Sequence, residues 1–193
     1  MIHGPKLISL WCAGTLALMV GACAMDNKDS MAMKDPDVGG AAMYPAKDIV
    51  DNAVNSKDHT TLVAAVKAAG LVNTLKSPGP FTVFAPTNEA FAALPAGTVD
   101  TLLKPENKPV LTKVLTYHVV PGILDTKTLD EWIAKNGGNV ALKTVSGGQL
   151  WVKGTGKDLW VTDEKGATAH ITIADVYQSN GVILVVDKVL MPN

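Results

Sequence analysis

The spacing of apolar residues changes along the chain and predicts helices in its first half and strands in its second. From residue 46 to residue 115, apolar residues recur at helical spacing in short segments that end at Gly or Pro. From residue 140 onward, short apolar runs are separated by Gly-containing turns, which is typical of β-hairpins. Helices early and strands late predict an α+β fold class.

The predicted helices are short, and several have recognisable ends. Asp58 is expected to be the N-cap of a helix that ends at Gly70, because Asp accepts hydrogen bonds from free N–H groups and Gly adopts the left-handed conformation. The other segments with helical spacing cover residues 46–56, 99–103, 109–117 and 129–135.

A strand passes directly into a helix in the segment Phe-Thr-Val-Phe-Ala-Pro-Thr-Asn-Glu-Ala-Phe. Pro86 is expected to end the strand because proline has no N–H to donate, and Thr87 stands at the helix N-cap. The segment holds the chain's three Phe residues, Phe81, Phe84 and Phe91. We therefore expect a core to form here.

The second half predicts a run of strands. A hairpin is expected from residues 140–145 and 149–153, followed by strands at 159–162 and 169–173. Residues 182–190 are almost continuously apolar, so this strand is expected in the centre of a sheet, covered on both faces.

Three segments, in this order, resemble signature segments of the fasciclin-like domain family. The first contains Phe81, Phe84, Pro86, Thr87, Asn88 and Phe91, the second is Tyr-His-Val-Val-Pro-Gly from Tyr117, and the third contains Asn180, Gly181 and Asp187. The resemblance covers residues 44–193. It implies a fasciclin-like fold, with a β-sandwich-like core of two sheets and several N-terminal helices packed around it.

The first 22 residues have the form of a signal peptide: Lys6, an apolar run, and then small residues before Cys23. Val-Gly-Ala-Cys resembles a lipoprotein box, which predicts cleavage before Cys23 and lipidation of that residue. Ordinary cleavage after Ala24 would instead release a soluble, secreted protein. An Ala after the Cys resembles outer-membrane sorting, so we expect a lipoprotein anchored in the outer membrane that faces the periplasm or the cell surface.

Residues 23–45 are rich in Asp, Lys, Gly, Ala and Met without an apolar period, and are expected to be a flexible tether. The domain is expected to cover residues 46–193. The thioethers of the tether's Met residues are soft ligands of the kind that bind Cu(I), but no His or free Cys completes a ligand set, so incidental Met in a linker is the interpretation we prefer.

Composition argues against several classes of function. All 17 basic residues are Lys and the net charge is −1, so the bidentate guanidinium contacts typical of nucleic-acid recognition are excluded. After the leader, the only Cys is Cys23, so the domain is expected to have no disulfide.

No local motif points to catalysis, and we expect neither an enzyme nor a bound cofactor. The histidines after the leader are His59, His118 and His170, without the spacing of a metal site. The family often has His where this chain has Leu184, and this departure removes a second imidazole. No metal site is therefore predicted.

The fasciclin resemblance implies two pairs of interaction residues. The segment of Tyr117 and His118 and the pair Asp175 and Val176 correspond to segments linked to adhesion in animal relatives. The residues themselves also fit structural roles: His118 as a buried ring that bonds a backbone group, and Asp175 in a turn at the end of a strand.

Trp151 and Trp160 fall on consecutive predicted strands. If they share an exposed face, their rings can stack on sugars, and otherwise they pack in the core or at an edge. Together these observations predict an exported, non-catalytic adhesion or matrix-binding module with a protein or glycan partner at the cell envelope. A membrane would be contacted only through the lipid anchor, and self-association is left open. The alternative is a periplasmic protein that binds a small ligand or a metal.

Overall fold

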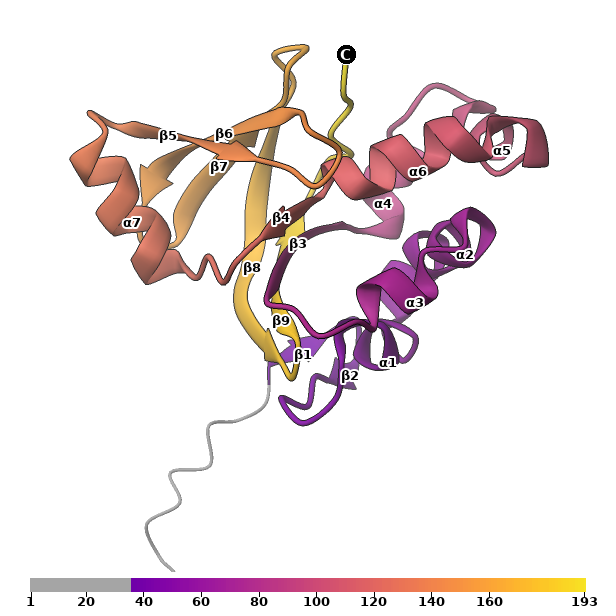
Figure 1. Cartoon of the computed structure of the whole chain (residues 1–193), viewed down its shortest axis with the longest axis horizontal. Coiled ribbons are helices and arrows are strands. Elements are labelled where there is room, and N and C mark those ends of the chain that lie inside the picture. The colour runs from indigo at the N-terminus through magenta and orange to yellow at the C-terminus, as the bar shows by residue number, and fades with distance from the viewer. Residues whose placement is uncertain (1–35) are drawn as a thin grey trace, which may run out of the picture. The chain divides into compact units, whose positions relative to one another are not determined.

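The computed structural model describes residues 36–193, which form an α+β domain (Figure 1). The helices are α1 (Ile49–Ala53), η1 (Lys57–His59), α2 (Thr60–Ala69), α3 (Val72–Leu75), α4 (Asn88–Ala92), α5 (Thr98–Leu102), η2 (Pro105–Asn107), α6 (Lys108–Tyr117) and α7 (Thr126–Lys135). The strands are β1 (Asp37–Val38), β2 (Ala41–Ala42), β3 (Phe81–Pro86), β4 (Val119–Pro121), β5 (Asn139–Lys143), β6 (Gln149–Thr155), β7 (Asp158–Thr162), β8 (Thr168–Gln178) and β9 (Gly181–Val186).

Seven of the strands form one sheet, in the order β4-β3-β9-β8-β7-β6-β5. All neighbours are antiparallel except β3 and β9, which are parallel. The two edges approach each other after β5, where the N–H of Val145 donates to the carbonyl of Val119 at 2.8 Å, so the sheet is nearly a barrel.

The two separate sheets predicted from the sequence are not confirmed, because β8 is shared by both halves of the sheet. It pairs with β7 through residues 168–170 and with β9 through residues 171–178. Its pairing with β9 shifts register twice, and Asp175 has a positive φ of 58°. Bulges of this kind bend a strand, and here they turn one sheet back on itself.

β3 and β9 lie in the middle of the domain and separate two hydrophobic cores. Val83, Ala85, Ile183 and Val185 face the core that the N-terminal helices and α6 complete. The alternate residues Phe84, Leu184 and Val186 face the other core, between the sheet and α7. The predicted central position of the last strand is therefore confirmed, with every residue of β9 buried. Leu184 is fully buried and fills the second core.

Two of the three predicted helix ends are confirmed. The hydroxyl of Thr87 accepts from the N–H of Ala90, and Gly70 ends α2 in the left-handed conformation. The prediction for Asp58 is wrong, because η1 precedes α2 and no side chain within it caps α2. The amide oxygen of Asn88 accepts from the N–H of Thr61 at 3.0 Å in its place.

The tether prediction is wrong for residues 36–45, which belong to the folded domain. β1 and β2 form a hairpin, and Val38 and Met43, each only 2% exposed, pack in the first core. The segment is rich in small residues and contains two Gly residues, so it has no alternating apolar pattern that would predict strands. The remaining tether, the signal peptide and Cys23 lie outside the described residues.

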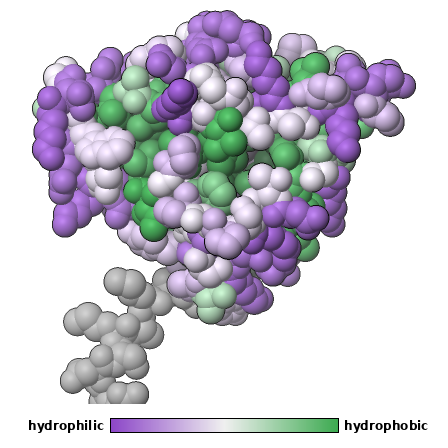
Figure 2. Space-filling model, in the orientation of Figure 1, coloured by the Kyte–Doolittle hydropathy of each residue, from purple (hydrophilic) through white to green (hydrophobic). Residues whose placement is uncertain are grey.

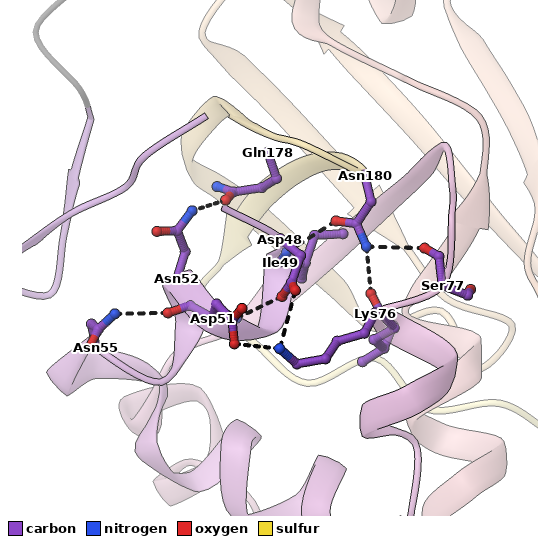
Figure 3. A network of polar contacts seen from close by, with 10 residues as sticks. Asp48, Ile49, Asp51, Asn52, Asn55, Lys76, Ser77, Gln178 and Asn180 are labelled. Carbon is purple, nitrogen blue, oxygen red and sulfur yellow. Dashed lines mark hydrogen bonds and ion pairs between the residues drawn. The ribbon is translucent and has the colours of Figure 1, made fainter. Parts of the chain in front are cut away.

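Asn180, at the turn between β8 and β9, connects the sheet to the first helices (Figure 3). Its amide oxygen accepts from the N–H of Ile49 at 3.1 Å, and its amide nitrogen donates to the carbonyls of Leu75 and Ser77. Nearby, Asn52 donates to the buried amide of Gln178. The third signature segment therefore positions α1 and α3 against the sheet.

Candidate functional site

Tyr117 and His118 are both buried at the junction of α6 and β4, with exposed fractions of 0% and 3%. The hydroxyl of Tyr117 donates to the carbonyl of Gln149 at 2.6 Å and accepts from the N–H of Glu164 at 3.1 Å. Burial raises the pKa of Tyr117 to about 12. In this conformation neither side chain can contact a partner directly.

The ring of His118 bonds two backbone groups, as the structural interpretation of this residue predicted. Nδ1 lies 2.8 Å from the carbonyl oxygen of Val114, and Nε2 lies 3.0 Å from the N–H of Leu190. A carbonyl can only accept and an N–H can only donate, so Nδ1 carries the proton and Nε2 accepts. Complete burial lowers the pKa of His118 to about 4. The ring is therefore neutral and connects α6 to the C-terminal segment.

Asp175 and Val176 lie within β8 and not in a turn at its end. The carboxylate of Asp175 accepts from the N–H and the hydroxyl of Thr126, the first residue of α7. Val176 is fully buried in the first core. This pair therefore anchors α7 to the bulge of β8, and only Asp175 is partly accessible.

The remaining residues of the signature segments also have structural roles. Asn88 caps α2, as described above, and a Cβ at Gly181 would overlap the carbonyl oxygen of Phe81. Asp187 accepts from the N–H of His170 at 2.7 Å. The resemblance to the family thus identifies residues that build the fold.

Trp151 and Trp160 share one face of the sheet. Trp151 is opposite Thr162 in the pairing of β6 with β7, and Lys153, two residues along, is opposite Trp160. Residues two apart on a strand lie on the same face, so the two rings are diagonal neighbours. The flanking residues Leu150 and Leu159 point into the second core. We call this surface the outer face of β5–β8.

Three side chains of the outer face, Asp158, Trp160 and His170, contact one another. The rings of Trp160 and His170 lie 4.6 Å apart at their centroids, tilted by 48°. One carboxylate oxygen of Asp158 accepts from the indole N–H of Trp160 at 2.9 Å and lies 3.2 Å from Nε2 of His170. Trp160 remains 36% exposed and Trp151 is half-buried.

Sequence reasoning found the two Trp residues but missed Asp158 and His170. The alternation within the strands indicated which residues share a face, but the partners across the strands depend on register. Asp158 directly precedes the predicted strand Leu-Trp-Val and stands two residues before Trp160. This spacing places both side chains on the same face of a strand and could have indicated their contact. The resulting face combines an exposed indole with carboxylate, imidazole and hydroxyl groups, which suits non-covalent binding of a polar partner.

Residues 36–193 contain no candidate metal site and no candidate membrane-spanning helix. In that part of the chain, no three His, Cys, Asp or Glu side chains lie close enough to hold a metal ion. No helix there is both long and apolar enough to cross a membrane.

The chain is similar to a protein family and to individual proteins of that family. The Fasciclin domain family matches residues 57–192. The chain is 47% identical over 194 residues to protein sll1483 of Synechocystis sp., covering all of this chain and 99% of that protein. It is 34% identical over 167 residues to the cell surface glycolipoprotein MPB83 of Mycobacterium bovis, covering 83% of this chain and 68% of that protein.

A solved structure shows the same fold at low identity. A domain pair from the insect cell adhesion molecule fasciclin I superimposes with a TM-score of 0.52 and 24% identity. The match covers 67% of this chain and spans 43% of the solved pair.

Proposed function

The chain belongs to the fasciclin domain family, and from this premise we propose that it is a non-catalytic adhesion module that binds a partner at the cell envelope. The similar insect protein is named as a cell adhesion molecule, which supports the class of function. The family's Tyr-His segment is buried in this chain, so the proposal places binding on the outer face of β5–β8.

The observation that carries this proposal is the group of Asp158, Trp160 and His170. An indole that donates to a carboxylate and packs against an imidazole is held in one orientation, so little conformational entropy is lost when a partner stacks on it. The face also presents Lys153 beside Trp160. Apolar ring surface next to charged and hydroxyl groups fits the alternating apolar and hydroxyl faces of a sugar.

The test is binding of the full chain to a glycan array, with Trp160→Ala and Trp132→Ala compared. Trp132 lies on α7 and is 40% exposed, so it is a matched control for the loss of an exposed indole. We expect Trp160→Ala to lose the signal and Trp132→Ala to retain it. Equal loss in both variants, or a signal insensitive to Trp160, would refute a site on this face. If the full chain binds no glycan on the array but still mediates adhesion of cells, the partner is a protein.

We also propose that the chain is exported and lipidated at Cys23. The lipoprotein box supports this, and the similar mycobacterial protein is named as a cell surface glycolipoprotein. Cys23→Ala should abolish incorporation of labelled fatty acid. Protease treatment of intact cells then separates two locations: loss of the domain indicates the cell surface, and protection indicates the periplasm.

The alternative function is that of a periplasmic protein that binds either a metal ion or a small ligand. Among the described residues, no group of side chains supports binding of a metal ion. The small ligand is favoured by one observation, an apolar cavity beneath the first helices.

A further inference from the structure

The outer face of β5–β8 contains a row of side chains that crosses four strands, which we call the Trp160 row. Asn139 is opposite Lys153, Lys153 is opposite Trp160, and Trp160 is opposite His170. Side chains directly opposite each other in an antiparallel pair have Cβ atoms about 5 Å apart. Because Lys153 and Trp160 are both exposed, an ammonium group stands beside the indole ring at the surface.

Charge is distributed unevenly along the Trp160 row. The carboxylate of Asp158 lies 3.2 Å from Nε2 of His170, and so on the β8 side of Trp160, whereas Lys153 lies on the β6 side. The same carboxylate accepts from the indole N–H of Trp160. Within residues 36–193, no ion pair involves Lys153. The β6 side of the ring therefore carries a positive charge that no acidic side chain neutralises.

Trp151 has a similar neighbour on the same face. It is opposite Ala141 on β5, which is small and covers little of the indole. Lys143 stands two residues beyond Ala141 and is exposed, so it is a diagonal neighbour of Trp151 within reach of a long side chain. In the described part of the chain, Lys143 forms no ion pair either. Each of the two rings thus has an ammonium group beside it.

This combination of groups selects among possible partners. Figure 2 shows apolar surface in the middle of the molecule, between polar surfaces at its two sides. The outer face of β5–β8 differs from such a surface, because its rings alternate with the ammonium, amide and hydroxyl groups of Lys153, Asn139 and Thr162. A neutral sugar would stack on the rings but would gain nothing from the two ammonium groups, whereas an acidic sugar gains from both.

We propose that the outer face of β5–β8 binds a carboxylated polysaccharide, whose rings stack on Trp151 and Trp160 and whose carboxylates pair with Lys143 and Lys153. This inference rests on the glycan binding proposed above and specifies the class of glycan. The charges beside Trp160 also give the sugar one orientation. Its carboxylate points toward β6, and its hydroxyl groups donate to Asp158, which can only accept. The reverse orientation would set two carboxylates against each other.

The test is calorimetric titration of the full chain with an oligosaccharide of galacturonic acid and with its methyl ester, which has the same rings without the negative charge. We expect the ester to bind about fivefold to tenfold more weakly. Lys153→Glu should weaken binding of the acid about tenfold, because it replaces an attraction with a repulsion, and should leave binding of the ester unchanged. Trp160→Ala should abolish binding of both.

The matched control is Lys104→Glu, which changes the net charge by the same amount. Lys104 is exposed between α5 and η2, and Figure 1 shows α5 on the opposite side of the domain from β5–β7. This variant should bind the acid like the wild type. Circular dichroism shows whether each variant is folded, and Lys153→Gln, which removes the charge without reversing it, replaces Lys153→Glu if that variant is not.

The outcomes separate this inference from the proposed function. Equal binding of acid and ester, both lost in Trp160→Ala, would overturn the acidic class but retain a glycan site on this face. Equal weakening by Lys153→Glu and Lys104→Glu would also overturn it, because net charge and not this face would then attract the acid. Binding of neither sugar would overturn it as well. A glycan array without any signal that depends on Trp160 would refute the proposed glycan site itself.

Discussion

Protonation of His118 should destabilise the domain between pH 6.5 and pH 4. Burial lowers the pKa of this ring from its ordinary value of 6.5 to about 4, so in this range the unfolded chain binds a proton that the folded chain excludes. Nε2 already accepts from the N–H of Leu190, and a proton there would set two donors against each other. The stabilising effect of the neutral ring is complete above pH 6.5 and is lost as the pH falls toward 4.

The size of the effect follows from the two pKa values. Each pKa unit corresponds to about 1.4 kcal/mol, so the free energy of unfolding should fall by about 2 kcal/mol at pH 5 and by about 3 kcal/mol at pH 4. Burial also lowers the pKa of His59, which adds a change in the same direction. Most small domains are stable by only 5–15 kcal/mol, so the loss is measurable.

Urea unfolding at pH 7.5, 6 and 5 measures this change directly, for the wild type, His118→Gln and His59→Gln. His118→Gln should be less stable at pH 7.5 but should lose most of its dependence on pH. His59→Gln removes the second histidine and isolates the contribution of His118. If His118→Gln retains the full loss of stability between pH 7.5 and 5, the assignment of this loss to His118 is refuted.

Two further predictions test how the N-terminal part is attached. Asn180→Ala removes the amide oxygen that accepts from the N–H of Ile49 and the amide nitrogen that donates to the carbonyls of Leu75 and Ser77. It should lower the free energy of unfolding, measured by urea titration, by about 2 kcal/mol. A change below about 0.5 kcal/mol would contradict this role of Asn180. Met43→Ala should lower the free energy of unfolding by about 3 kcal/mol, because the Met43 side chain is only 2% exposed. The control Val54→Ala, at a 49% exposed site, should change this free energy little. Equally small effects of the two substitutions would mean that residues 36–45 are a flexible tether.

The sequence predicted those parts of the fold that depend on local patterns. The continuous apolar run from Val182 predicted a central strand, and the Pro-Thr pair at 86–87 predicted the end of β3 and the start of α4. In each case the residues that determine the structure are adjacent in the chain. The class, α+β, followed from the order of such segments.

Features that depend on contacts between distant segments could not be predicted. Asn88 caps a helix that begins 28 residues earlier, and nothing near Thr60 indicates this. The bend of β8 includes the positive φ of Asp175. The carboxylate of this residue accepts from Thr126 of α7, a contact between segments 49 residues apart in the sequence. For the same reason the sequence indicated Trp160 on the outer face but not the group it forms with Asp158 and His170.

The position of β9 determines when the domain can fold. β9, which follows all the other strands in the sequence, lies between β3 and β8 and contributes to both cores. Until β9 has been synthesised, β3 and β8 therefore lack the strand that joins them in the sheet. A parallel pairing of β3 with β9 also requires a long loop to close first. We therefore expect the domain to stay unfolded on the ribosome until β9 has been synthesised, which would allow the unfolded chain to pass through a secretion channel if it is exported as proposed.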